Sequence, residues 1–145
     1  MSNKSLIISK INEISSLSNA YISKRLKEER IPVLRNHLPL FLILANNSNV
    51  MTFRRLVEEW SISKSSLSDI IIKYEALGLV RKCACDQDKR SIYIRLTSEA
   101  APIVESIKGI LEELSGSVLS SFNDKEQTEF ENHIDRAYQK IKNMS

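Results

Sequence analysis

The chain has 145 residues, 42% of them hydrophobic, and a formal net charge of +3. Three glycines and three prolines favour a mostly helical fold with short connections, and they exclude a glycine-rich nucleotide-binding loop. No apolar run approaches the roughly 18 residues of a membrane span, and Leu6-Ile7-Ile8 is too short for the core of a signal peptide. We therefore expect a soluble, cytoplasmic protein without a membrane partner.

A first helix is predicted over residues 5–30, because apolar residues recur there at three- and four-residue steps. Pro32 ends it, since proline pushes the preceding residue away from helical angles. A second helix is predicted at 35–46, with Pro39 in its first turn, where a missing N–H costs little. This helix is apolar almost all round, which favours burial. Residues 46–49 have the composition of a loop.

The middle of the chain has the order helix, turn, helix and hairpin. A break at Ser61 and Ile62 separates the two short helices, Gly78 ends the second, and two strand-like runs flank a charged tip at 86–90. This order presents one helix to the DNA major groove beside a wing. The sequence thus predicts a DNA-binding regulator rather than an enzyme. The helices are expected at 52–60 and 63–77, and the strands at 79–85 and 91–97.

Two amphipathic helices are predicted after residue 97. Thr97 or Ser98 is the expected N-cap of the first, and Pro102 indicates a kinked or delayed start. Asn123 and Glu126 are expected to form a capping box that opens the last helix. Residues 98–145 carry five Lys and Arg against nine Asp and Glu, whereas residues 50–97 carry nine against six. The middle of the chain is therefore the better candidate for a phosphate-facing surface.

We interpret residues 1–145 as a single domain, mainly α, with a winged helix-turn-helix lobe at 34–97. The flanking segments 5–30 and 98–143 carry wide apolar stripes and have no obvious sheet to cover them. A second copy of the chain would bury these stripes in a two-fold homodimer. The alternative is an intramolecular bundle with a solvated far face.

The middle segment resembles the MarR family of bacterial winged-helix regulators, and the resemblance extends to most of the chain. LVEEWSIS at 56–63 is similar to the family's helix-turn-helix, YEALGLV at 74–80 to the end of its recognition helix, and DKR at 88–90 with IRLT at 94–97 to its wing. The resemblance implies a homodimer joined through its terminal helices. Many family members repress transcription, so the resemblance also implies a repressor that releases DNA when a small molecule binds near the interface.

The sequence departs from the family at three positions. Ser61 stands where the family often has Gly, which is natural for such a bend. Asp69 stands in the middle of the recognition helix, where a basic residue is common, and Cys85 replaces the first acidic residue of the wing motif. These departures leave the fold intact, but Asp69 prevents the transfer of an operator sequence from a relative.

The recognition helix supplies most of the candidate DNA-binding residues. Ser63 is its expected N-cap, and the short hydroxyls that follow can contact phosphates or base edges. Asp69 could accept a hydrogen bond from cytosine N4, or it could pair with Lys73 at i+4, which is the favoured order of charges; we favour the pair. Together with the wing, the candidates are Lys64, Ser65, Ser66, Ser68, Asp69, Lys73, Lys89 and Arg90.

The charged tip of the hairpin is interpreted as the wing. Arg90 could enter a narrow minor groove, where the negative potential is enhanced, and Lys89 lies beside it. Asp88 is expected to orient an arginine rather than to contact DNA, because phosphates repel a carboxylate. In isolation this tip would be an ordinary solvated turn. Its position after a helix-turn-helix favours DNA contact.

The remaining reactive side chains carry little chemistry. Cys83 and Cys85 lie on the same face of one strand, where a bridge would be strained, and two cysteines cannot complete a zinc site. Reduced thiols are the default, with a redox switch beside the wing as the alternative. His37 and His133 are the two histidines, and we expect neither to bind metal. No cofactor and no catalytic residue is expected.

The resemblance also implies an effector pocket where the first and second helices meet the fifth, near Tyr21, His37 and Phe41. The alternative, which we favour, is that these residues are plain core. The predicted function is a homodimeric, sequence-specific transcriptional regulator that binds a pseudo-palindromic double-stranded operator and is released by a small aromatic or lipophilic effector. The alternative is a winged-helix module for protein–protein contact with weak or no specific DNA binding, consistent with the modest net charge.

Overall fold

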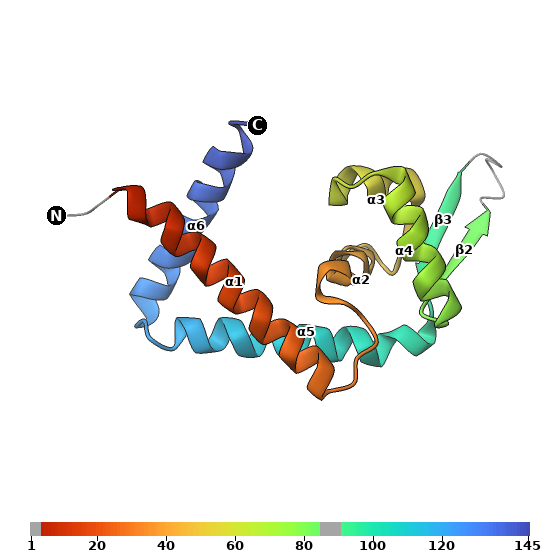
Figure 1. Ribbon diagram of the computed structural model, residues 1–145, viewed down its shortest axis with the longest axis horizontal. Helices are drawn as coiled ribbons and strands as arrows, with labels where there is room; N and C mark the ends of the chain where they lie inside the picture. The colour runs from red at the N-terminus through yellow and green to blue at the C-terminus, as the bar shows by residue number, and fades with distance from the viewer. Residues whose placement is uncertain (1–3, 85–90) are drawn as a thin grey trace. The chain divides into compact units, whose positions relative to one another are not determined.

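The computed structural model describes residues 4–84 and 91–145 (Figure 1). The predictions for Cys85, Asp88, Lys89 and Arg90 therefore lie outside the described residues. The chain forms two compact units, Met1–Ile110 and Leu111–Ser145. None of the helices within the described ranges combines the length and the apolar character that a membrane crossing needs.

The structure is mainly helical with a small antiparallel sheet, as the sequence predicted. In the first unit a long helix, a short 3-10 turn and a second helix precede the winged-helix elements, and α5 begins after a second 3-10 turn. The boundary between the units falls inside α5. In chain order the elements are α1 (Lys4–Glu28), η1 (Arg35–His37), α2 (Leu38–Asn46), β1 (Val50–Thr52), α3 (Phe53–Trp60), α4 (Lys64–Ala76), β2 (Val80–Ala84), β3 (Ile92–Leu96), η2 (Ser98–Ala100), α5 (Ala101–Leu119) and α6 (Asp124–Lys142).

The sheet has three strands in the order β1-β3-β2, and both pairs are antiparallel. The hairpin arms β2 and β3 were predicted, but β1 was not. Its three residues are too few to show the alternation that marks a strand. Met51 is buried and faces Ile94 across the pair, so β1 exists because a long-range partner is available.

The turn between α3 and α4 lies where the sequence predicted it. Ser61 ends α3 in the left-handed conformation, with φ of 58°, and its N–H donates to Val57 O at 2.9 Å. A serine in this conformation costs on the order of 1 kcal/mol, which a glycine would avoid. Ser63 then caps α4 by accepting a hydrogen bond from Ser66 N at 3.1 Å.

Gly78 ends α4 at a φ of 76°. The N–H groups of Gly78 and Leu79 donate to Glu75 O and Tyr74 O, at 3.0 and 2.9 Å, which is the Schellman arrangement. A Cβ at position 78 would also meet Glu99 Oε2 at 3.1 Å. Glycine is therefore required here for its backbone angle, since the exposed Glu99 side chain can move by the few tenths of an ångström that a Cβ needs.

The core of the first unit lies between α2, α4, the sheet and the first half of α5. The predicted burial of the second helix is confirmed, because four of the nine residues of α2 are buried. The side chains that the core excludes most completely from solvent are Leu40, Phe41, Leu44, Leu56, Leu67, Ile71, Tyr74, Val80, Ile94, Ile107 and Ile110. β2 packs against α4, and Figure 1 shows the two hairpin arms beside that helix.

The sequence predicted where the two terminal helices begin, but one of the two expected caps is not formed. Thr97 occupies the N-cap position of η2 without a side-chain capping hydrogen bond, and its hydroxyl donates to Gly78 O at 2.7 Å instead. Pro102 follows at the second position of α5, so the delayed start is confirmed. In the second unit, Asn123 accepts from Glu126 N at 2.9 Å while Glu126 Oε1 accepts from Asn123 N at 3.0 Å. This reciprocal pair is the predicted capping box.

Candidate nucleic-acid interface

Helix α4 has two faces of different character. Leu67, Ile71 and Tyr74 point into the core and are fully buried. Lys64, Ser65, Ser66, Asp69 and Lys73 are exposed. Ser68 was expected on the exposed face, but it is half-buried. It lies next to Leu67 and three residues before Ile71, which are both buried, so it stands at the edge of the buried face. The core thus fixes the helix and leaves its polar side open.

The hydroxyls at the start of α4 form a connected cluster. Ser63 Oγ accepts from Ser66 N, donates to Ser66 Oγ at 2.8 Å, and lies 3.3 Å from Ser65 Oγ. With its one proton given to Ser66, Ser63 can only accept from Ser65. Ser66 then keeps its own proton for an external acceptor such as a phosphate oxygen, and Ser65 keeps free lone pairs for an external donor. Ser63 therefore sets the polarity that both hydroxyls present.

The ion pair favoured for Asp69 is not formed. Of the ion pairs between described residues, none joins Asp69 to Lys73. Lys73 Nζ instead lies 5.5 Å from the centroid of the Tyr74 ring, a cation–π contact. The i+4 spacing permits a pair but does not enforce it, because exposed pairs contribute little. Asp69 thus keeps its carboxylate on the open face of α4.

Ile72 is a residue of this face that the sequence did not single out. Its side chain is 57% exposed, and it lies three residues after Asp69 and seven after Ser65, which is one side of a helix. Ile72 is the last of three consecutive isoleucines, Ile70-Ile71-Ile72, and only one face of a helix can be buried. The run itself does not show which isoleucine stays exposed. An exposed aliphatic group here could contact a thymine methyl.

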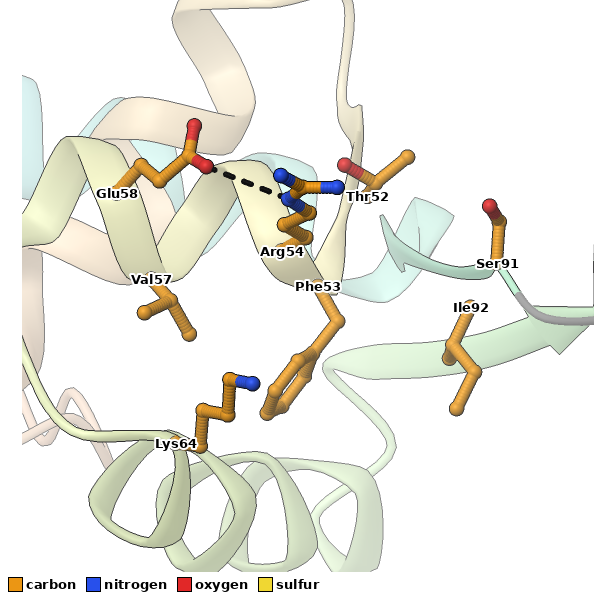
Figure 2. Close-up of a pocket in the computed structure, with 8 residues that line it drawn as sticks. All are labelled: Thr52, Phe53, Arg54, Val57, Glu58, Lys64, Ser91 and Ile92. Atoms are coloured by element: carbon orange, nitrogen blue, oxygen red, sulfur yellow. Dashed lines mark ion pairs between the residues drawn. The ribbon is translucent and has the colours of Figure 1, made fainter.

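A groove of about 750 Å³ runs between the starts of α3, α4 and β3 (Figure 2). Figure 2 shows the Lys64 side chain reaching toward the Phe53 ring and Val57, with Ile92 on the opposite wall. Arg54 lies at the rim, where its Nε is 3.4 Å from Glu58 Oε1. The groove is therefore apolar within and charged at its rim, and it adjoins the open face of α4.

The two arginines at the start of α3 are exposed. Arg54 and Arg55 each pair with a glutamate four residues later, and the Arg55–Glu59 distance is 3.1 Å. Both pairs are exposed. Such pairs are worth well under about 1 kcal/mol, so an arginine can exchange its glutamate for a phosphate at little cost.

The hairpin arms bring two further cations together. Arg81 of β2 lies directly opposite Arg95 of β3, and both are exposed. They line a smaller cavity of about 310 Å³ together with Glu99. Like charges opposite each other destabilise a strand pair unless an anion lies nearby. The sequence could not show this pair, because it depends on the register of the hairpin.

Both the sequence and the fold of this chain are similar to those of known regulators. Residues 32–91, which include α2, α3, α4 and β2, match the model of the MarR family. The chain is also similar to a MarR transcriptional regulator from Methanosarcina mazei Go1, with a TM-score of 0.82 and 20% identity over 97% of this chain and 99% of that chain. The chain thus has the fold of the MarR winged-helix regulators, and its middle segment matches the model of that family.

Two other MarR-like structures contain a bound partner. Sco3205 from Streptomyces coelicolor, a MarR family transcriptional regulator in complex with DNA, has a TM-score of 0.77 at 20% identity, over 93% of this chain and 85% of that chain. NadR in complex with 4-hydroxyphenylacetate has a TM-score of 0.72 at 18% identity, over 90% and 91%. At these identities the likeness is one of fold.

The three residues expected near a MarR effector pocket do not form one group. His37 and Phe41 both contact Tyr74, with ring centroids 5.4 and 5.1 Å away in edge-on geometry. Tyr21 is half-buried on α1, and the aromatic contacts of the described residues do not join it to the other two. Neither groove described above includes any of the three.

Two pKa values of the described residues are shifted, and both groups lie at one place in the fold. Burial lowers the pKa of His37 below its ordinary value of 6.5, and the nearby charge of Lys73 lowers it further. Burial also raises the pKa of Tyr74, partly offset by the hydrogen bond from Leu34 N–H. Both shifts favour neutral side chains where α4 meets the segment before α2.

Proposed function

We propose that this protein is a homodimeric, sequence-specific DNA-binding regulator that represses transcription and releases its operator when a small molecule binds. The observation that carries the proposal is the two-sided recognition helix. Its buried side locks α4 to the core, and its open side presents Lys64, Ser65, Ser66, Asp69 and Ile72. Hydroxyls, a carboxylate and an aliphatic group on one face can read base edges in the major groove.

Backbone contacts would come from the basic groups around this face. The groove beside Lys64 lies between α4 and the start of β3, so a sugar–phosphate strand that leaves the major groove toward the wing would cross it. Arg54 at its rim and the opposed Arg81 and Arg95 add positive charge. We propose that Lys89 and Arg90 extend this surface into the minor groove, with Asp88 orienting an arginine.

Dimer formation is supported by apolar side chains that the chain leaves uncovered. On α1 the exposed apolar residues are Leu6, Ile7, Ile8, Ile11, Ile14 and Leu17. On α6 they are Phe130, Ile134, Tyr138 and Ile141. We propose that residues 5–30 and 98–143 form the dimer interface of a single MarR-like domain around the lobe at 34–97. Two-fold symmetry would then match a pseudo-palindromic operator.

Release by an effector is supported by one structure of the same fold and by the packing around Tyr74. NadR was solved with an aromatic acid, 4-hydroxyphenylacetate, and shares the fold of this chain. We propose a small aromatic or lipophilic effector for this protein as well, acting in the cytoplasm. His37 and Phe41 pack on Tyr74 of the recognition helix, so a ligand that displaced either one would act on α4.

The test is selection of genomic DNA fragments by the purified protein at two salt concentrations. We expect enrichment of an inverted repeat whose half-sites are centred about one helical turn apart. We also expect Arg90→Ala to weaken binding and to lower its dependence on salt by about one phosphate contact. Arg136→Ala on α6 is the matched control and should leave both unchanged.

Weak binding without sequence preference in the wild-type protein would contradict the proposal. That outcome would favour a second function, a winged-helix module that binds another protein. The exposed Ile72 on the open face of α4, together with the glutamate-paired Arg54 and Arg55, is the observation that favours this alternative. Retention of a protein partner by wild type but not by Ile72→Asp would establish it.

A further inference from the structure

The recognition helix is tied to the segment before α2 through one hydroxyl. Tyr74 of α4 is fully buried, yet its Oη reaches a polar neighbourhood. Leu34 N–H donates to it at 3.1 Å, and His37 Nδ1 lies 2.7 Å away. The two hydrogen bonds join residues that are 40 and 37 positions apart in the chain. Tyr74 is therefore a point of contact between the recognition helix and the connection that follows α1.

The ring of Tyr74 is held firmly enough to aim this hydroxyl. Phe41 packs edge-on against it at 89°, and His37 does so at 86°. Lys73 covers the ring as a cation–π partner. A phenylalanine would fill the same space and keep these ring contacts. The hydroxyl is thus not needed for burial, and its role lies in the two hydrogen bonds.

The Tyr74 hydroxyl can donate to His37 while it accepts from Leu34. Because Tyr74 Oη accepts from Leu34 N–H, its own proton is available to His37 Nδ1. When Tyr74 donates this proton, His37 is neutral and carries its own proton on Nε2. A protonated imidazole would donate from Nδ1 as well, which leaves the Tyr74 proton without that acceptor. Protonation therefore converts a satisfied pair into one with a half-buried, unsatisfied donor.

The charges around His37 oppose its protonation. From α4, Lys73 acts directly on the imidazole. From the end of α1, which also contacts η1, Arg25 pairs with Glu28 and Glu29 at 3.1 and 3.9 Å, so these charges largely compensate one another. Arg35 lies on η1 itself and is a further cation. Among the charged groups of residues 4–84 and 91–145, Lys73 is the one that acts on His37, and it would repel a protonated imidazole.

We propose that the Tyr74 hydroxyl is a positioning group that holds the recognition helix against residues 34–37, and that protonation of His37 loosens this hold and weakens DNA binding. The inference rests on the proposed function, since it concerns the helix that would read the operator. Below neutral pH the protein would therefore release DNA more readily, through a contact that lies away from the DNA-facing side of α4.

The first experiment measures operator binding from pH 7.5 to 5.5, using the enriched fragment and three variants. His37→Gln supplies an acceptor that takes no proton, Tyr74→Phe removes the hydroxyl, and His133→Gln removes the other histidine, which is exposed on α6. Between pH 7.5 and 5.5, wild type and His133→Gln should lose about three- to ten-fold more affinity than His37→Gln loses. This factor corresponds to the usual net contribution of one hydrogen bond. Tyr74→Phe should bind more weakly at pH 7.5 and lose the extra pH dependence.

The second experiment does not need DNA. Amide hydrogen exchange, corrected for its intrinsic pH dependence, should show Leu34 N–H losing protection in Tyr74→Phe, and in wild type at pH 5.5 but not in His37→Gln. Equal protection in all variants would overturn the inference, as would the same pH profile of DNA binding in wild type and His37→Gln. If wild type binds no DNA at any pH, the proposed function fails, and the exchange result still decides whether Tyr74 holds α4.

Discussion

The winged-helix lobe and the terminal helices satisfy their apolar side chains in different ways. In the lobe, Phe41, Leu67 and Tyr74 are completely buried by neighbours from the same chain. On α6, all of which the structure describes, no residue is buried, and on α1 Leu26 is the buried one. The same kind of amphipathic pattern thus produces a closed core in one region and an uncovered apolar surface in the other.

The contrast between the lobe and the terminal helices shows that periodicity predicts which face of a helix is apolar but not what covers that face. In the lobe, a sheet and several helices lie within a short stretch of chain, so the apolar face of each element packs against the apolar face of another. Ile14 of α1 and Ile134 of α6 are each more than half exposed. Exposed apolar residues in rows along α1 and α6 are typical of a binding surface, and we propose a second copy of the chain as the partner.

The largest effect is expected from a change in the closed core. Phe41→Ala should lower the free energy of unfolding of the lobe by about 3 to 5 kcal/mol, because it removes a fully buried ring that packs on Tyr74. Denaturant unfolding followed by circular dichroism measures this. Leu77→Ala, at an exposed position of the same lobe, is the control and should change stability by about 0.5 kcal/mol or less. Equal losses in the two variants would erase the contrast between buried and exposed positions.

The second effect concerns the uncovered surface. Ile134→Glu should raise the dimer dissociation constant at least about 100-fold, because each copy loses roughly 2 kcal/mol of apolar burial and gains a buried charge. Sedimentation velocity across a concentration series measures the constant, and circular dichroism should show an intact lobe. Arg136→Glu places a glutamate two residues later, on the opposite side of α6. It changes the charge by two units rather than one and should still not dissociate the dimer. An unchanged dimer in Ile134→Glu would place the interface elsewhere.

The third effect separates two caps of equal worth. Ser63→Ala and Asn123→Ala should each cost about 1 kcal/mol of stability, since each removes a side-chain acceptor at a helix N-terminus. Ser63→Ala should also weaken operator binding, because Ser65 and Ser66 lose the hydroxyl that orients them. Titration of labelled operator compares the two. Matching losses of affinity would show that the serine cluster is a cap and nothing more.

The smallest effect is a pH dependence of stability within the lobe. The folded state lowers the pKa of His37 below 6.5, so the unfolded chain binds more protons between 6.5 and that lowered pKa. Stability should not depend on His37 above about pH 6.5 and should fall as the pH drops through this window. Unfolding curves of wild type and His37→Gln should diverge there, whereas His133→Gln should follow wild type. Parallel curves would remove His37 as the cause.

The local features of this protein could be predicted from its sequence alone. The limits of the helices, the caps at Ser63 and Asn123, the stop at Gly78 and the late start of α5 all follow from residues within one or two turns of each other. Helical hydrogen bonds and caps connect near neighbours, so residue type and spacing suffice to predict them. The order helix, turn, helix and hairpin was predicted from the same local signals, and the structure confirms it.

The tertiary structure decided everything that depends on partners distant in the chain. It created β1 from three unremarkable residues and set Arg81 opposite Arg95. It also directed the Tyr74 hydroxyl to His37, and left Asp69 without the pair that its spacing allows. These outcomes depend on register and packing, which bring together residues tens of positions apart, and a local pattern carries no information about which distant residue will be the neighbour.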